Sequence, residues 1–391
     1  MLMVSSDAID REFVVDLLRD MVATDSVNPT VGRGKGELEI SNLIYDRLVS
    51  IGGLEVHKQL VTKSRSNVIA ILRGSPHGRS LMLNGHMDTV GTEGMIIEPF
   101  SPVVENGRLH GRGSCDMKGA IAAMIGAAKC LVDSNTKLLG DLMLAFVVDE
   151  EYVSVGMKKL IEKYRADAAI VGEPTGMKVA TAHKGFVWVE VEARGKAAHS
   201  SVPERGVNAI SLTAKVVCGL DRLQQQLAAR AHPILGAPKV HASVIEGGTD
   251  WSIVPDRCIL RLERRTLPGE SAQSVMAEIR DIIQKVRLEN PDFAAGARDV
   301  YNMPPLETSS SEPVVDLLCR TVSELTGERQ ASIGVPYWTD GALLSRSAAI
   351  PTCVFGPGDI RVAHSADEYV KLEDVLNSAE IYRRISERFC S

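Results

Sequence analysis

Aromatic residues are scarce in this chain of 391 residues, because Phe, Trp and Tyr together make up only 4% of it. Proteins that bind single-stranded nucleic acid stack the bases on aromatic side chains, so this content argues against that class. Basic residues do not gather either: no segment forms a basic patch, and the formal net charge is −6. Binding to a phosphate backbone depends on such a patch. We therefore expect no nucleic-acid partner.

Long apolar runs are missing as well. Every run is interrupted well before the roughly 20 residues that a membrane-spanning helix needs, so we expect no membrane partner. The opening residues, MLMVSSDAIDREF, turn acidic almost at once and lack the basic start and apolar stretch of a signal peptide. The seven cysteines are scattered without a CxxC pair, which is typical of reduced thiols. These features predict a cytoplasmic protein.

The apolar residues that are present follow two patterns. In the first, short apolar runs that predict buried strands alternate with segments of helical periodicity. This alternation predicts an α/β domain with a mostly parallel sheet and helices on both faces. The expected strands are residues 66–74, 80–86, 141–151, 168–174 and 349–356, and the expected helices are residues 7–24, 37–51, 117–133, 155–164, 313–326 and 373–389.

The second pattern occupies the middle of the chain, where apolar and polar residues alternate as they do in half-exposed strands. It predicts an α+β sandwich with one open sheet face, inserted into the first domain. The expected strands are 184–195, 239–248, 258–266 and 296–302, and the expected helices are 206–228 and 270–288. We expect a catalytic domain at 1–182 and 299–391, and an inserted lid or dimerisation domain at 183–298.

Histidines and carboxylates follow the apolar strands of the first pattern. SLMLNG runs into His86, LMLAFVV precedes Glu151, AAIV precedes Glu173, and CVFGPG precedes His364. In open α/β sheets, ligands bind beyond the carboxyl ends of the strands, so these side chains are expected to meet. A fifth candidate, Asp116, lies in the glycine-punctuated segment GRGSCDMKG at the start of a helix.

Metal chemistry explains these residue types, since imidazole and carboxylate ligands suit zinc, cobalt and manganese. Two metal ions about 3.5–4 Å apart need a bridging carboxylate, which we assign to Asp116. We assign His86 and Glu173 to one metal ion, and Glu151 and His364 to the other. The open positions would hold a water or hydroxide as the nucleophile.

Two further acids adjoin the ligands. Asp88 stands two residues after His86, so on an extended chain both side chains point to one side. Its carboxylate is expected to accept the second ring N–H of His86 and fix the tautomer. Glu150 precedes the ligand Glu151 and is free to act as general base and then as general acid.

These residues resemble a metallopeptidase family that includes acetylornithine deacetylase, succinyl-diaminopimelate desuccinylase, aminoacylases and glutamate carboxypeptidases. The matching stretches span nearly the whole chain: NGHMDTV, PFSPVVENGRLHGRGSCDMKGAIAAM, VVDEEYVSVG, VGEPTG, AHKG, AAHSSVPERGVNAI and FGPGDIRVAHSADEYV. The resemblance implies a zinc-dependent amidohydrolase, with cobalt able to substitute, that has an inserted lid and forms a homodimer through it. Within the family, the GEPT segment and the last stretch look most like acetylornithine deacetylase, an enzyme of arginine biosynthesis.

The resemblance also implies roles that spacing alone does not give. His199, in AAHSS, looks like the lid histidine that stabilises the oxyanion, often from the partner subunit. Arg265, in ERRTLPGE, resembles the arginine that clamps the substrate carboxylate, whereas Arg264 is expected to be a solvated charge on the other side of the strand. Ser252 departs from the family, since many relatives have asparagine there. Asp340, in WTDGALL, either contacts the substrate or holds a loop.

The sequence thus predicts a di-zinc deacylase that acts on an N-acyl amino acid. A dipeptidase or glutamate carboxypeptidase using the same site is the alternative. A non-catalytic metal- or ligand-binding protein is disfavoured, because binding alone does not require Glu150. A two-metal phosphoesterase is disfavoured by the carboxylate clamp assigned to Arg265.

Overall fold

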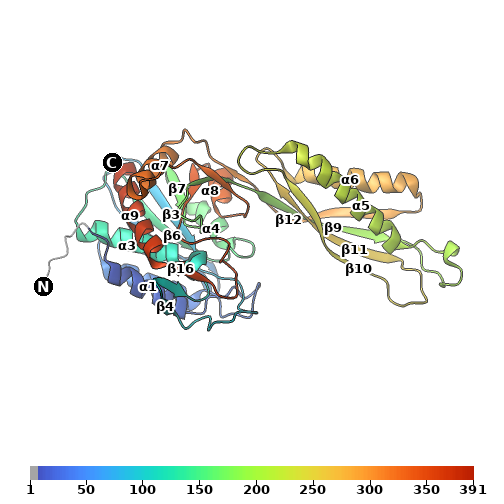
Figure 1. The fold of residues 1–391 in the computed structure, drawn as a ribbon, viewed down its shortest axis with the longest axis horizontal. Coiled ribbons are helices and arrows are strands. Elements are labelled where there is room, and N and C mark those ends of the chain that lie inside the picture. The colour runs from blue at the N-terminus through green and yellow to red at the C-terminus, as the bar shows by residue number, and fades with distance from the viewer. Residues whose placement is uncertain (1–7) are drawn as a thin grey trace. The chain divides into compact units, whose positions relative to one another are not determined.

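The computed structural model describes residues 8–391, so the expectations for residues 1–7 lie outside the described residues. Two compact units make up the chain (Figure 1). Unit 1 comprises the described residues up to Thr181 together with Thr308–Ile333 and Thr339–Ser391. Unit 2 comprises Ala182–Glu307 and Gly334–Trp338. Each unit has a hydrophobic core of its own.

The helices and strands follow the order of the sequence patterns. The helices are α1 (Arg11–Ala23), α2 (Leu38–Ile51), α3 (Gly119–Asp133), α4 (Val155–Lys163), α5 (Ala209–Leu227), α6 (Ala272–Glu289), α7 (Pro313–Thr326), α8 (Gly341–Ala348) and α9 (Leu372–Phe389). The strands are β1 (Glu55–Thr62), β2 (Arg65–Leu72), β3 (Leu81–His86), β4 (Val103–Glu105), β5 (Arg108–His110), β6 (Leu142–Val147), β7 (Ala168–Val171), β8 (Ala180–His183), β9 (Gly185–Arg194), β10 (Lys239–Gly247), β11 (Arg257–Thr266), β12 (Ala294–Met303), β13 (Leu306–Glu307), β14 (Ile333–Val335), β15 (Thr352–Val354) and β16 (Tyr369–Lys371).

The large sheet has the strand order β1-β2-β6-β3-β7-β15-β8-β13. Its four central strands, β6, β3, β7 and β15, run parallel to one another. The flanking pairs β1–β2, β2–β6, β15–β8 and β8–β13 are antiparallel. The expected mostly parallel α/β sheet is therefore confirmed at the centre of the sheet. The carboxyl ends of β6, β3 and β7 lie side by side at one edge.

Helices cover both faces of this sheet (Figure 1). Helices α1, α2, α3, α7 and α9 pack together on one face, while α4 and α8 pack on the other. Helix α3 is rich in alanine and glycine because it is buried all round, between the sheet and the outer helices α1 and α9. A Cβ at Gly126 would lie only 2.4 Å from Cγ2 of Val14. Small residues thus let these layers approach closely enough to place Asp116, which precedes α3, near the sheet edge.

Unit 2 is an antiparallel sheet of order β10-β11-β9-β12 with helices α5 and α6 packed together against one face. Residues of β9 alternate between buried valines and partly exposed polar residues. The buried set packs with apolar residues of both helices, and the opposite face carries paired arginine and glutamate side chains. This is the α+β arrangement with one open sheet face that the alternation indicates.

The second boundary of unit 2 falls at Glu307, later than the expected residue 298. The reason is that β12 pairs along its length with β9, so a division at 298 would cut through a strand of the unit 2 sheet. The short segment Gly334–Trp338 also belongs to unit 2. Within it, Trp338 donates its indole N–H to the carbonyl of Pro304 at 3.0 Å.

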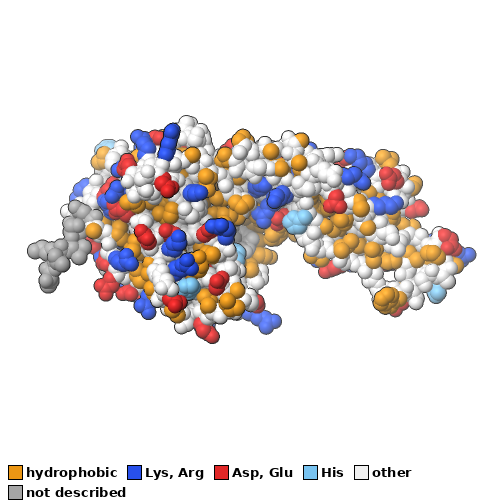
Figure 2. All heavy atoms as spheres, viewed as in Figure 1, with side chains coloured by type: hydrophobic (Ala, Val, Ile, Leu, Met, Phe, Trp, Pro, Cys, Tyr) orange, Lys and Arg blue, Asp and Glu red, His pale blue; other side chains and the backbone are white. Residues whose placement is uncertain are grey.

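The surface shown in Figure 2 carries basic and acidic side chains interspersed with apolar ones. Among residues 8–391, no helix combines the length and the apolar character required to cross a membrane.

Candidate metal centre

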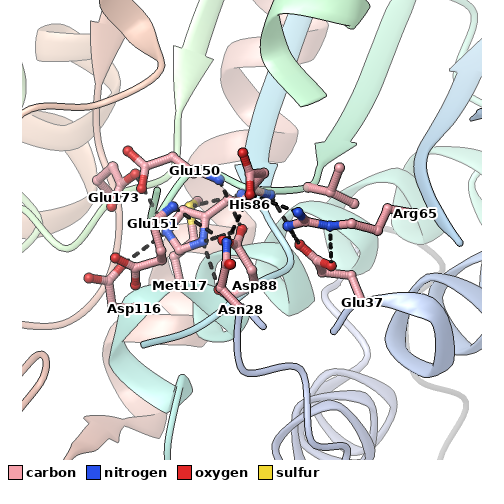
Figure 3. Close-up of polar contacts among 12 residues, drawn as sticks. Asn28, Glu37, Arg65, His86, Asp88, Asp116, Met117, Glu150, Glu151 and Glu173 are labelled. Atoms are coloured by element: carbon pink, nitrogen blue, oxygen red, sulfur yellow. Dashed lines mark hydrogen bonds and ion pairs between the residues drawn. The ribbon is translucent and has the colours of Figure 1, made fainter. Parts of the chain in front are cut away.

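Three neighbouring parallel strands deliver ligand-type side chains to one edge of the sheet. His86 is the last residue of β3, Glu150 and Glu151 follow β6, and Glu173 follows β7. Because these strands run in the same direction, their carboxyl ends meet at one edge, as the sequence predicts. All four side chains lie together in Figure 3.

Asp116 reaches the same edge from a loop with unusual backbone geometry. Gly111 and Gly113 have φ values of 142° and 80°, which side chains rarely tolerate. A Cβ at Gly113 would also lie 2.7 Å from the methyl group of Thr89. The glycines of GRGSCDMKG therefore shape the turn that presents Asp116.

His364 completes the cluster from the loop between β15 and β16. Its Nε2 lies 3.2 Å from Oδ2 of Asp116 and 3.1 Å from Oε1 of Glu151. On the other side, Nε2 of His86 lies 3.1 Å from Oδ1 of Asp116 and 3.7 Å from Oε1 of Glu173. Asp116 thus turns one carboxylate oxygen to each histidine, which is the arrangement of a bridging ligand.

The cluster fits a pair of cations in two respects. The ligand atoms of His86, Asp116 and Glu151 lie within 4.8 Å of one another, as do those of His86, Glu150 and Glu173. In addition, the buried Oε1 of Glu173 has no hydrogen-bond partner among residues 8–391. A buried carboxylate oxygen without a donor is costly unless a cation or another donor satisfies it. Two imidazoles and several carboxylates form a donor set that suits zinc, cobalt or manganese.

The two histidines have strongly raised pKa values. Burial alone lowers the pKa of His86, but hydrogen bonding to Asp116 and the charge of Glu173 outweigh burial and raise it well above its ordinary value. For His364, burial again lowers the pKa, while the bonds to Asp116 and Glu151 raise it to about 11. Without cations, both rings therefore hold protons at neutral pH.

The carboxylates shift in both directions. Burial raises the pKa of Asp116, but hydrogen bonds from His364 and His86 outweigh it and leave that pKa lowered. Burial, followed by repulsion from Glu173, raises the pKa of Glu150 well above its usual range. Burial and repulsion from Asp116 do the same for Glu173. Perturbed pKa values of this kind are typical of catalytic and metal-binding sites.

Asp88 contacts His86 in a different way from the one expected. The ring Nδ1 of His86 lies 2.9 Å from the backbone carbonyl of Asp88 and 3.7 Å from its carboxylate Oδ1. The carbonyl therefore accepts the Nδ1–H bond, which still leaves Nε2 facing the cluster. The carboxylate instead accepts the backbone N–H groups of Glu150 at 3.1 Å and Glu151 at 3.2 Å.

Asp340 is a buried carboxyl group at the start of α8. Burial raises its pKa to about 7, and the nearby Ser154 hydroxyl opposes that rise. Neither carboxylate oxygen of Asp340 has a hydrogen-bond partner among residues 8–391, so the structure shows no loop that this side chain holds. Assignment of Asp340 to the substrate site stays a prediction.

The remaining predicted site residues lie in unit 2. His199 is exposed, and its Nδ1 lies 2.8 Å from the hydroxyl of Ser201. Ser252 accepts the backbone N–H of Ser200 through its carbonyl, at 2.9 Å. Arg265 is partly exposed and pairs with Glu263 at 2.6 Å. The predicted roles of His199 and Arg265 in binding and catalysis stay predictions.

The expectation that Arg264 is a solvated charge is wrong. Its side chain is 0% exposed and forms ion pairs with Glu270 at 2.6 Å and Glu278 at 3.2 Å. Arg264 shares the face of β11 that also buries Leu260 and Leu262 against the helices.

Four residues close to the cluster do not figure among the sequence predictions. Asn28, Glu37 and Arg65 contact the segment that carries Glu150, and Glu368 contacts the loop that carries Asp116. No sequence motif or spacing indicates that Asn28, Glu37 and Arg65 lie near the cluster, since each comes from a different loop or strand end. The position of Glu368 gives a weak indication that it lies near the cluster, because it belongs to the same AHSADEYV stretch as His364.

The fold and the cluster are those of an α/β protein with a candidate site for two metal ions. A family model described as Peptidase family M20/M25/M40 matches residues 82–388, and the chain belongs to this family.

Relatives and neighbours match the chain over almost its whole length. Acetylornithine deacetylase of Myxococcus xanthus is 31% identical over 386 residues, which cover 95% of this chain and 96% of the relative. N-formyl-4-amino-5-aminomethyl-2-methylpyrimidine deformylase of Bacillus subtilis is 28% identical, covering 97% and 95%. The crystal structure of an aminopeptidase from Bacillus cereus has a TM-score of 0.80 at 23% identity, covering 98% of this chain and 100% of that one. Family and site together identify a metal-dependent hydrolase that acts on amide bonds.

Proposed function

We propose that this protein removes the acyl group from an N-acyl amino acid, as an acetylornithine deacetylase-like enzyme. The observation that carries the proposal is the position of Glu150, whose carboxylate lies within 4.8 Å of the ligand atoms of His86 and Glu173. Both relatives described above are named for removing a small acyl group, one acetyl and the other formyl. The likeness to the aminopeptidase supports the fold alone.

Each residue of the site has a task in this reaction. Two cations bound by His86, Asp116, Glu151, Glu173 and His364 would supply Lewis acidity, polarising the amide carbonyl and making water more acidic. Glu150 takes a proton from the attacking water and later delivers it to the leaving nitrogen.

Unit 2 supplies the remaining contacts in this proposal. His199 donates a hydrogen bond to the oxyanion as negative charge develops on the carbonyl oxygen. Arg265 binds the free carboxylate of the amino acid through its planar fork. We further propose that two zinc ions occupy the site, that cobalt can replace them, and that the protein is a cytoplasmic homodimer formed through unit 2.

A hydrolysis panel tests the proposal. N-acetyl, N-succinyl and N-formyl amino acids, including N-acetylornithine, are incubated with zinc- or cobalt-loaded enzyme beside dipeptides, and the released amine is measured. An N-acyl amine without a carboxylate and a set of phosphate esters serve as controls. We expect an N-acyl amino acid to give the highest kcat/KM. Preference for dipeptides would replace the deacylase with a dipeptidase, and no turnover of any amide would refute both.

A further inference from the structure

The carboxylate of Asp88 acts as a clamp on the backbone of the segment that follows β6. Its Oδ1 accepts the N–H of Glu150, and its Oδ2 accepts the N–H of Glu151 at 3.2 Å. These two bonds set the direction in which both glutamate side chains leave the backbone. The orientation of Glu150 and Glu151 therefore depends on what holds Asp88 in place.

Asn28 ties Asp88 to the residue before those two glutamates. Its side-chain amide donates to Oδ2 of Asp88 at 2.8 Å (Figure 3). The same amide donates to Oδ1 of Asp149 at 3.1 Å. Asp149 is itself in an uncommon backbone conformation, with φ of 71°. A non-glycine residue keeps such a conformation only where its surroundings fix it, so Asp149 requires neighbouring groups that hold it by hydrogen bonds.

Glu37 and Arg65 supply those partners. Nη1 of Arg65 donates to Oδ1 of Asp149 at 2.8 Å, and Oε1 of Glu37 accepts the backbone N–H of Asp149 at 3.1 Å. Arg65 also binds both carboxylate oxygens of Glu37, with Nε to Oε2 at 2.7 Å. The Glu37 side chain is 0% exposed and that of Arg65 is 13% exposed, so water competes little for these bonds.

The charges explain why an arginine stands here. Asp88, Asp149 and Glu37 are three buried carboxylates within one hydrogen-bonded network, and Arg65 is the cation that binds two of them, Glu37 and Asp149. A planar guanidinium can bind Glu37 with two bonds and still reach Asp149 with the third nitrogen, whereas an ammonium group presents all its donors from a single nitrogen.

We propose that the Glu37–Arg65 ion pair is a positioning device for the reaction: by fixing Asp149 it holds the turn that aims Glu150 and Glu151 at the metal site. Neither residue is among the five assigned metal ligands, and the contacts of both run to the turn that carries Asp149. The proposal deepens the function proposed above and rests on it for its kinetic consequence, while its structural consequence can be measured without any substrate.

The test compares Arg65→Met with Arg73→Met. Arg73 directly follows the same strand, β2, and pairs with Glu55 at 2.7 Å, but its side chain is 53% exposed. It therefore reports what the loss of an ordinary ion pair does to the same strand. The milder variant Glu37→Gln keeps an oxygen for Asp149 and serves where Arg65→Met does not fold.

Three quantities are measured on folded protein. Hydrogen exchange of the peptide that covers residues 148–154, in metal-free protein, should be about tenfold faster in Arg65→Met and unchanged in Arg73→Met. Metal affinity, measured against a competing chelator, should fall in Arg65→Met. With saturating metal, kcat on the best panel substrate should fall about 10- to 100-fold while KM changes little.

Unchanged exchange, metal affinity and kcat in folded Arg65→Met, or in Glu37→Gln where the first variant is unfolded, would overturn the proposal. A lower Tm with kcat per folded molecule at the wild-type level would also overturn it, because that result describes a purely structural ion pair. If wild-type protein hydrolyses no amide, the proposed function fails, and the exchange and affinity measurements still decide the positioning role.

Discussion

The carboxylate of Glu368 accepts the backbone N–H of Asp116 at 3.1 Å, although the two residues are 252 positions apart in the chain. The same carboxylate accepts the N–H of Cys115 at 2.9 Å and of Gly113 at 3.0 Å, and pairs with Arg112 at 2.6 Å. Its side chain is buried. Glu368 therefore holds the whole loop that presents Asp116.

Glu368→Gln should destabilise the metal-free protein by about 3 kcal/mol or more. Each carboxylate oxygen faces two N–H donors, so the amide NH₂ would oppose donors in either orientation and leave Arg112 buried without a full partner. Urea unfolding measures the effect. Glu373→Gln, an exposed neighbour on α9, should change stability by less than about 0.5 kcal/mol. A loss below about 1 kcal/mol for Glu368→Gln would show that the loop does not depend on this carboxylate.

Substitutions of the two adjacent arginines of β11 should affect different quantities, one the stability of the protein and the other the KM for substrate. Arg264→Met should cost about 3 kcal/mol of stability, because it removes the buried partner of Glu270 and Glu278. Arg265→Met should leave stability nearly unchanged and raise KM for carboxylate-bearing substrates by about tenfold or more. Thermal unfolding and steady-state kinetics of both variants check this contrast. Equal KM values for Arg265→Met and wild type would remove Arg265 from the substrate site.

The sequence is sufficient to predict that the strand-end side chains meet, because one rule covers them. His86, Glu151 and Glu173 follow parallel strands, and parallel strands end at a common edge. The alternation of β11 also indicates that Arg264 is buried. Arg264 lies two and four positions after the buried Leu262 and Leu260, and so on the same face of the strand. The expectation for Arg264 was wrong because it took the face of β11 opposite Arg265 as the solvent face, whereas that face packs against the helices.

Other features depend on contacts that spacing does not encode. The two-residue spacing places Asp88 on the same side as His86, but it does not determine whether the carbonyl or the carboxylate meets the ring. Glu37 and Arg65 come from separate segments and meet only when α2 and β2 have packed. Long-range polar networks of this kind become visible only in the folded structure.

His199→Ala should lower kcat by about 100- to 1,000-fold, the usual effect of removing one oxyanion donor, without changing metal content. Elemental analysis and steady-state kinetics measure the two quantities. If His199 acts across a dimer, mixing this variant with Glu150→Ala should restore part of the activity. Loss of metal from folded His199→Ala would contradict the assignment, since a residue of unit 2 is not expected among the ligands.

Binding of zinc to the metal-free protein at neutral pH should release protons. The raised pKa values of His86 and His364 mean that both rings are protonated before the cations bind, and a metal ligand must be neutral imidazole. Apparent metal affinity should therefore rise with pH, as fewer protons have to be displaced. Calorimetric titration in two buffers of different ionisation enthalpy counts the protons. Release of none would contradict the charge state inferred for the cluster.

The most direct test of the central claim is a paired measurement on Glu150→Ala: bound metal per chain and turnover of the best panel substrate. Glu150 lies within ligand reach of His86 and Glu173, so geometry alone permits it to be a ligand or a proton carrier. As the proton carrier, its loss should lower turnover by about 100- to 10,000-fold while two metal ions stay bound. Loss of a metal ion from the folded variant, or turnover near the wild-type rate, would contradict the account.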